Sequence, residues 1–393
     1  MSADSIRVVL VGGGIGGLAA ANALLHRGID VHVYEQAPAL GEVGAGVMIT
    51  PNSLRLLDRF GVGDAVAAVG ASVGEGSLYY REDGSTVAPM LTVDSSGWNG
   101  MFGVHRADLI GALADVLPAD RVHTGHQAVS FSQDEREAVV SFANGTEVRA
   151  DAVIAADGIH SVLQKYVIEP SAPIDSGSVA YRGLVPAERV PWWPKGVSQL
   201  WMGEQRHFLV YPVRRGTLIN YVGFVPSREK AVESWTAEGD VETLRREFAT
   251  WDSPVPRLLA EVEKTNWWGL YDRDPLSTWT RGRLTLLGDA AHSMLPHLGQ
   301  GANQSIEDAA ALSVFLADAT AETVPEALSH YEALRRSRTT EVQLGARANG
   351  RRYDSHFQDL AERDAEIADS ARFRSWLYDY DAEAAAEEVL AVR

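Results

Sequence analysis

The chain has 393 residues, with 35 basic and 53 acidic side chains, and a formal net charge of −18. This length suits two packed domains, and an apolar share of 46% is typical of a globular protein. The negative charge repels phosphate backbones and anionic lipid, so we expect neither nucleic acid nor a membrane as a partner. Cys is absent, which excludes disulfides, thiolate catalysis and Cys-based metal sites, and we expect no metal.

The N-terminal region predicts a βαβ unit. Residues 6–11 form an apolar run typical of a strand buried on both faces of a parallel sheet. Residues 18–25 are rich in Ala and Leu and predict a helix that Gly28 ends, and residues 29–35 predict the next strand.

Residues 8–25 are apolar enough to be mistaken for a membrane span or a signal peptide. A secretory signal has a basic start and a small-residue cleavage site, and neither is found here. Five glycines between Gly12 and Gly17 would also weaken a spanning helix. We therefore interpret the segment as buried core and expect a cytoplasmic protein.

The middle of the chain predicts antiparallel structure. An Asn144-Gly145 turn joins two short apolar runs as a hairpin signature. Residues 178–224 alternate apolar and polar positions between Gly and Pro, which favours a mostly antiparallel sheet. Two more short buried strands are predicted at 152–156 and 283–287, and the pattern beyond Gly301 is helical.

A glycine-rich motif follows the first strand. The run from Gly12 to Gly17 satisfies GxGxxG at Gly12, Gly14 and Gly17. The first glycine permits a tight turn, the second lets the backbone approach a pyrophosphate, and the third lets helix and strand pack closely. Glu35 ends the second strand, near the offset of about 20 residues expected for an acidic residue that binds a ribose hydroxyl. The motif predicts a dinucleotide, either NAD or FAD, without a 2′-phosphate.

Two later strands end at Asp-bearing turns, Asp157-Gly158 and Gly288-Asp289. A carboxylate at the carboxyl end of a strand points into the crevice where ligands bind, although either Asp alone would more often cap a helix. Together with GxGxxG, the three ordered motifs resemble those of the single-component (group A) flavoprotein aromatic hydroxylases. Among these the chain is most similar to salicylate hydroxylase, 3-hydroxybenzoate 6-hydroxylase and 6-hydroxynicotinate 3-monooxygenase, from Ile6 to about Gln343.

The resemblance implies FAD as cofactor and NADH or NADPH as co-substrate. It implies that Glu35 binds the adenosine ribose, that Arg106 contacts FAD, and that Asp157 serves both FAD and the nicotinamide donor. Asp289 would bind the ribityl or pyrophosphate part. The other implied cofactor-binding residues are the glycines Gly12, Gly14 and Gly17, Pro296 near the flavin, and Gly301, Ala302 and Asn303, which would open a helix with its positive end toward the flavin.

Two positions depart from the family pattern. Gln164 stands where the Asp-Gly motif usually has an Arg, which favours NADH over NADPH. Ser293 stands where a Pro usually follows the His of the Gly-Asp motif, while Pro296 remains.

The substrate side is indicated by three residues. On a strand, His207 and Tyr211 share one face, and a His is suited to accept the proton of a phenol near neutral pH. Without other information both would be read as packing residues, but the resemblance implies that His-x-x-x-Tyr-Pro is a phenol-activating pair. It also implies that His297 is an active-site His, as in the hydroxynicotinate enzymes. Pro296 replaces the active-site Gln of the 3-hydroxybenzoate enzyme, which argues against that substrate.

The resemblance therefore implies an FAD-dependent monooxygenase that uses NAD(P)H and O2, through a flavin C4a-hydroperoxide, to hydroxylate a small phenolic aromatic acid of the salicylate type. A hydroxy-N-heteroaromatic substrate, 6-hydroxynicotinate-like or quinolone-like, is an alternative. A non-hydroxylating FAD-dependent reductase or dehydrogenase is another, and a plain NAD-binding regulatory protein would leave Asp157 and Asp289 unexplained. The GxSxG pattern at Gly70–Gly74 lacks the strand-then-helix order of a hydrolase nucleophile elbow.

The expected fold is α/β, a Rossmann-like FAD-binding domain with an inserted, mostly antiparallel β-sheet substrate domain and C-terminal helices. We expect the FAD-binding domain at 1–175 and 271–350, the substrate domain at 176–270 and the helical segment at 351–393. The acidic tail from Asp381 predicts a solvated helix face, with a homodimer contact as the alternative.

Overall fold

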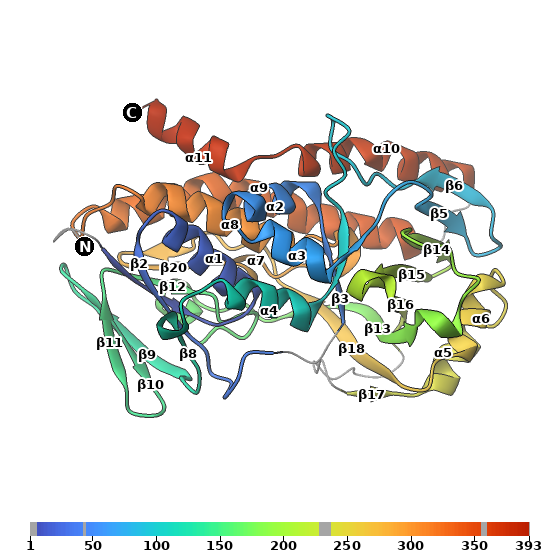
Figure 1. Ribbon diagram of the computed structural model, residues 1–393, viewed down its shortest axis with the longest axis horizontal. Helices are drawn as coiled ribbons and strands as arrows, with labels where there is room; N and C mark the ends of the chain where they lie inside the picture. Colours follow the sequence, from blue (N-terminus) through green and yellow to red (C-terminus); the bar gives the residue numbers. More distant parts are fainter. Residues whose placement is uncertain (1–5, 42–44, 228–236, 355–359, 393) are drawn as a thin grey trace.

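The computed structural model describes residues 6–41, 45–227, 237–354 and 360–392. Two large sheets lie side by side, and the C-terminal helices run along both of them (Figure 1). The first sheet has six strands in the order β19-β20-β12-β1-β2-β8, and all but β19 are parallel. Its strands are β1 (Arg7–Val11), β2 (Asp30–Tyr34), β8 (Val122–His123), β12 (Ala152–Ala155), β19 (Thr280–Arg281) and β20 (Leu284–Leu286).

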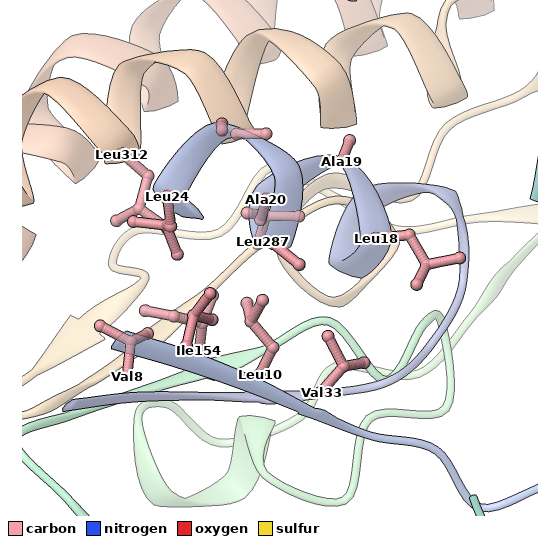
Figure 2. Packing of buried hydrophobic residues seen from close by; sticks show 14 of the residues in the cluster. Val8, Leu10, Leu18, Ala19, Ala20, Leu24, Val33, Ile154, Leu287 and Leu312 are labelled. Carbon is pink, nitrogen blue, oxygen red and sulfur yellow. The ribbon is translucent and has the colours of Figure 1, made fainter. Parts of the chain in front are cut away.

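The βαβ prediction is confirmed, and residues 8–25 are core. Helix α1 (Ile15–His26) carries small and apolar side chains on nearly every face, so it can be buried between the sheet and helix α8 (Gly301–Leu316). Figure 2 shows Leu24 of α1 pointing toward the strands, beside Leu312 of α8. Gly28, which follows α1, has a φ of +78° that only glycine adopts without strain.

The second sheet has eight strands in the order β17-β18-β13-β16-β15-β14-β5-β6. It is antiparallel except where β14 pairs with β5, as the alternating pattern predicted. Two of its strands, β5 and β6, precede the substrate domain expected at 176–270. The expected domain boundaries stay predictions. The strands are β5 (Leu78–Arg81), β6 (Thr86–Pro89), β13 (Ile174–Pro186), β14 (Gln199–Gly203), β15 (Arg206–Val213), β16 (Leu218–Pro226), β17 (Glu238–Gly239) and β18 (Thr265–Asp272).

Two small sheets complete the fold. The predicted hairpin is confirmed within β9 (Ala128–Gln133), β10 (Ala138–Phe142) and β11 (Glu147–Ala150). The other small sheet joins β3 (Gly46–Ile49), β7 (Phe102–His105) and β4 (Ala71–Ser72). Ser72 of the GxSxG pattern lies exposed on β4 directly after a helix, so it is not a nucleophile elbow. Three helices come from the same N-terminal part of the chain as this small sheet: α2 (Pro51–Arg59), α3 (Gly63–Val69) and α4 (Arg106–Asp115). Two further helices, α5 (Val241–Glu247) and α6 (Pro254–Ala260), lie beside the eight-stranded sheet.

The C-terminal region is helical, as predicted. Helix α9 (Val324–Asp354) contacts β19 and β20 of the first sheet and β14 and β15 of the second, so it ties the two sheets together (Figure 1). Helix α10 (Leu360–Tyr378) contacts β6, and α11 (Ala382–Ala391) packs on α8. In the part of the chain that the structure describes, no helix is long and apolar enough to cross a membrane.

A buried ionic network joins α8 to α9 and to the short helix α7 (Asp289–His292). The guanidinium of Arg335 donates to Glu307 and to Asp308, each at 2.8 Å. Arg338 donates to Glu307, and His292 Nε2 lies 2.5 Å from Asp308 Oδ2. Burial alone would raise the pKa of Glu307, but Arg338 and Arg335 outweigh it and lower that pKa below its usual range.

Candidate active site

A cavity of about 660 Å³ lies where the two large sheets meet. One wall is the carboxyl edge of the parallel sheet, the place where open α/β sheets bind ligands. The opposite wall comes from the eight-stranded sheet and includes Arg182, Tyr211 and Trp268. Most of the predicted cofactor residues line this cavity: Gly12, Gly14, Glu35, Arg106, Asp157, Asp289, Pro296, Gly301 and Ala302.

The three motif glycines have distinct roles in the turn after β1. Gly12 has a φ of +113°, and a Cβ there would lie 2.2 Å from the carbonyl oxygen of Ala156. A Cβ on Gly17 would lie 2.0 Å from the carbonyl oxygen of Gly12, so Gly17 serves helix–strand packing and does not line the cavity. Among the residues that the structure describes, a Cβ on Gly14 would meet nothing within 4 Å. Gly14 therefore leaves room on the cavity side, where a phosphate can approach the backbone.

Glu35, predicted to bind the adenosine ribose, and Arg106, predicted to contact FAD, both line the large cavity. The Glu35 carboxylate accepts hydrogen bonds from the backbone N–H groups of Gly13 and Ala37, both at 2.7 Å. It thereby fixes the glycine turn as well as facing the cavity. Arg106 is the first residue of α4, and its backbone N–H donates to the carbonyl of Ala45.

The two Asp-bearing turns stand side by side at the sheet edge. Asp157 Oδ2 accepts from the N–H of Val162, while Oδ1 is buried without a partner among the residues described. Burial raises the pKa of Asp157 above its usual range. Gln164, at the position where the family has Arg, is buried and donates its amide to the carbonyl of Ala290, so it ties the Asp157 turn to the Asp289 turn.

Helix α8 begins at the cavity, as predicted. Gly301 and Ala302 line it, but Asn303 does not. The Asn303 side chain is buried and bonded instead to the β3–α2 corner: it accepts from the N–H of Thr50 at 3.0 Å and donates to the carbonyl of Met48 at 2.9 Å. Asn303 thus holds that corner against the start of α8.

A second cavity of about 80 Å³ adjoins the first and shares walls with it at Met48, Leu209, Phe224, Pro296 and Gly299. His207 and His297 line this smaller cavity, with ring centroids 5.1 Å apart. His207 also stacks on Phe224 at 3.9 Å. Tyr211 lines the large cavity instead, so the predicted catalytic residues are divided between two connected spaces.

The two histidines have different electrostatic surroundings. Nδ1 of His207 lies 2.5 Å from Oδ1 of Asp354, at the end of α9. Burial, with a smaller contribution from His207, lowers the pKa of His297 to about 3, although Asp354 opposes this shift. His297 is therefore neutral near pH 7. Burial raises the pKa of Tyr211 far above its usual range, so Tyr211 stays a neutral phenol.

A family model described as FAD binding domain matches residues 5–344. The chain belongs to this family. The FAD-binding protein is 37% identical over 387 residues to 3-amino-4-hydroxybenzoate 2-monooxygenase of Streptomyces platensis, with 96% of each chain covered. It is 35% identical over 402 residues to salicylate hydroxylase of Pseudomonas putida, covering 96% of this chain and 93% of the relative. A solved salicylate hydroxylase substrate complex matches it with a TM-score of 0.85 and 30% identity over 98% of each chain.

These similarities confirm the predicted family, the α/β fold and the FAD cofactor, and they make the chain an FAD-dependent aromatic monooxygenase. The residues of the large cavity fit the cofactor on their own geometry. Gly14 leaves open space at the turn, and the buried Oδ1 of Asp157 lacks a partner in the described part of the chain. Asp289 is exposed to the cavity beside Gly301 at the start of α8.

Sequence reasoning missed three residues of the FAD-binding protein's small cavity and its surroundings. Asp354 bonds to His207, and Tyr353 and Arg374 line the cavity wall. They belong to α9 and α10, where the sequence shows only a helical pattern without a motif. Arg182, opposite on the large sheet, was also missed, and its guanidinium stacks on Trp268 at 4.2 Å.

Proposed function

We propose that this enzyme hydroxylates a small phenolic aromatic carboxylic acid with O2 and NADH. The observation that carries the proposal is the small cavity, in which a carboxylate-bonded His207 lies beside the cofactor cavity across the shared wall of Pro296 and Gly299. The relatives' printed names support it, since salicylate and 3-amino-4-hydroxybenzoate are both benzoates with a ring hydroxyl.

The cofactor residues divide the dinucleotide among them. The glycine turn and the start of α1 would hold the pyrophosphate, Glu35 the adenosine ribose, and Asp289 the ribityl or pyrophosphate part. The first residues of α8 would face the flavin with their N–H groups, which favour an anionic reduced ring. Bound FAD supplies the redox and oxygen chemistry, taking reducing equivalents from the nicotinamide and activating O2.

The protein's own contribution is to hold the ring and move one proton. Since Nδ1 of His207 faces Asp354, Nε2 is the nitrogen left to take the proton of a substrate hydroxyl. The Asp354 carboxylate stabilises the imidazolium that results. The deprotonated ring is richer in electrons and reacts more readily with an electrophilic oxygen. His207 is only 1% exposed, so this transfer is shielded from bulk water.

Two finer points belong to the proposal. NADH is favoured over NADPH because Gln164 replaces an Arg and makes an internal hydrogen bond to Ala290. A hydroxy-N-heteroaromatic acid is the second candidate substrate, because the neutral imidazole of His297 lines the small cavity and can bond to a ring nitrogen or its N–H. We also propose a cytoplasmic location, where NADH is available.

The test is NADH consumption with product identification under 18O2, on FAD-loaded protein, across salicylate, 3-amino-4-hydroxybenzoate, 6-hydroxynicotinate, 3-hydroxybenzoate and uncharged phenol. We expect one acid to speed NADH consumption and to yield one product carrying a single 18O atom. If an acid is itself reduced or dehydrogenated and no product of the panel contains 18O, the enzyme is a reductase or dehydrogenase and the proposal is wrong. Sedimentation of the same protein tests the homodimer considered for the acidic tail.

A further inference from the structure

Arg374 of α10 presents a guanidinium to the small cavity, and no Asp or Glu of the described residues lines that cavity. Nη2 donates to the hydroxyl of Tyr353 at 3.1 Å and Nη1 to the hydroxyl of Tyr378 at 3.4 Å. Its Nε is buried and has no hydrogen-bond partner in the described ranges. The ring of Tyr79 lies 5.9 Å from the guanidinium carbon.

The Tyr79 hydroxyl does not neutralise this cation. Burial raises the pKa of Tyr79 well above its usual range even against the charge of Arg374, so Tyr79 stays a neutral phenol. An arginine keeps its charge at every pH of interest. Among the residues described, Arg374 is also the only Lys or Arg that lines the small cavity, whose other walls include Met90, Leu91 and Leu200. A cation in apolar surroundings without a counter-ion favours an anionic ligand.

We propose that Arg374 binds the carboxylate of the substrate and thereby selects aromatic acids over neutral phenols. This inference rests on the proposed function and assigns a specificity residue to it. Tyr353 lies between Arg374 and His207. Its hydroxyl accepts a hydrogen bond from Arg374, and its ring centroid lies 5.2 Å from that of His207. The substrate's anionic group then lies against α10 and its hydroxyl lies at His207.

The inference accounts for how a strongly acidic protein accepts an acidic substrate. A net charge of −18 repels a carboxylate at long range. A desolvated guanidinium at the cavity offers a local, directional attraction, and its planar fork can donate two parallel hydrogen bonds to one carboxylate. The alternative is that Arg374 only anchors α10 to the tyrosines, and this role would be indifferent to the charge of the ligand.

The experiment compares benzoate with benzamide, which has nearly the same shape and no charge, by titrating FAD-loaded enzyme and following the flavin absorption spectrum and the heat of binding. We expect the wild type to bind benzoate more tightly than benzamide. Arg374→Gln should weaken benzoate about tenfold or more and leave benzamide within about twofold. Arg374→Lys should recover part of the loss, and Arg372→Gln, an exposed neighbour on the same helix, should change neither ligand.

Three results would overturn the inference: no preference for benzoate in the wild type, equal weakening of both ligands by Arg374→Gln, or unchanged benzoate binding by that variant. The wild-type comparison needs no variant, so misfolding of Arg374→Gln does not remove the test. Failure here is distinct from failure of the proposed function. If the enzyme hydroxylates an acid while Arg374→Gln binds benzoate normally, the proposed function holds and the role of Arg374 is wrong. If benzoate binding depends on Arg374 but no 18O is incorporated, the role of Arg374 holds and the proposed function is wrong.

Discussion

The imidazole of His207 and the carboxylate of Asp354 meet at 2.5 Å although 147 residues separate them in the chain. The His comes from β15 in the eight-stranded sheet, and the Asp ends the long helix α9. This contact sets which ring nitrogen of His207 remains for a substrate, and it makes α9 a part of the candidate active site.

Asp354→Asn should therefore slow hydroxylation about ten- to hundredfold by lowering kcat, with KM changed little, because the amide no longer stabilises the imidazolium. The share of NADH that ends as hydrogen peroxide should rise, and FAD binding should stay normal. Asp354→Glu should restore part of the coupling. Exposed Asp318→Asn is the matched control, and an Asp354→Asn enzyme as well coupled as wild type would remove Asp354 from the mechanism.

Gly14→Ala should weaken FAD binding about tenfold while the protein folds normally. The added methyl meets no atom of the described residues within 4 Å and the φ of Gly14 is −77°, so we expect it to obstruct a ligand in the cavity rather than the fold. FAD titration and thermal melting of the apoprotein measure the two effects separately.

Gly17→Ala should do the opposite and destabilise the fold by about 1–3 kcal/mol, because its methyl would press on the carbonyl of Gly12. Gly111→Ala, in open space within helix α4, is the control: it should leave FAD binding unchanged and should not destabilise the fold, because Ala is the better helix former. Equal loss of stability in Gly14→Ala and Gly17→Ala would contradict the separate roles of the two glycines.

Arg335→Met should lower the free energy of unfolding by about 3–5 kcal/mol, since it leaves Glu307 and Asp308 buried with less compensating charge. Urea unfolding of the apoprotein, with the exposed Arg372→Met as control, measures the difference. If the free energy of unfolding falls by less than about 1 kcal/mol, Arg338 and His292 are enough to stabilise the buried carboxylates of Glu307 and Asp308.

Acid should destabilise the protein partly through His297. Its pKa falls from 6.5 to about 3 on folding, so the unfolded chain binds an extra proton between these values. Stability from the neutral, buried imidazole is complete above about pH 6.5 and is lost as the pH falls toward 3, with a slope of at most about 1.4 kcal/mol per pH unit. Urea unfolding from pH 7 to 5 should show a smaller dependence of stability on pH for His297→Gln than for the wild type. Parallel curves for wild type and His297→Gln would contradict this.

The cofactor side of the site was predictable because its motifs are short and local in the sequence. The turn at Gly12, the acidic end of β2 and the Asp residues after β12 and β20 each depend on residue types within a few positions of one another. Their order along the chain placed them at one edge of a parallel sheet, and the large cavity lies at that edge.

The substrate side depends on contacts between distant segments, and there local patterns were not enough. Strand alternation predicted that His207 and Tyr211 share one face of the sheet. It could not predict that two cavities lie against this face, with Tyr211 lining the large one and His207 the small one. Asp354 and Arg374 carry no motif, because any helix exposes acidic and basic residues and only the path of the helix decides which ones face inward. Asn303 matches a family position, yet its side chain holds Thr50 and Met48 rather than lining the cavity.

The strand order β20-β12-β1-β2 has a consequence for how the chain folds as it is synthesised. The central strand β1 leaves the ribosome first, but β12 follows only at Ala152 and β20 at Leu284, and α8 is complete only at Leu316. Until then α1 lacks the helix that covers it, and one edge of the nascent sheet stays open to mispairing. The dinucleotide site of a newly made chain is therefore incomplete until Leu316 has emerged, and we expect the nascent sheet to be prone to mispairing up to that point.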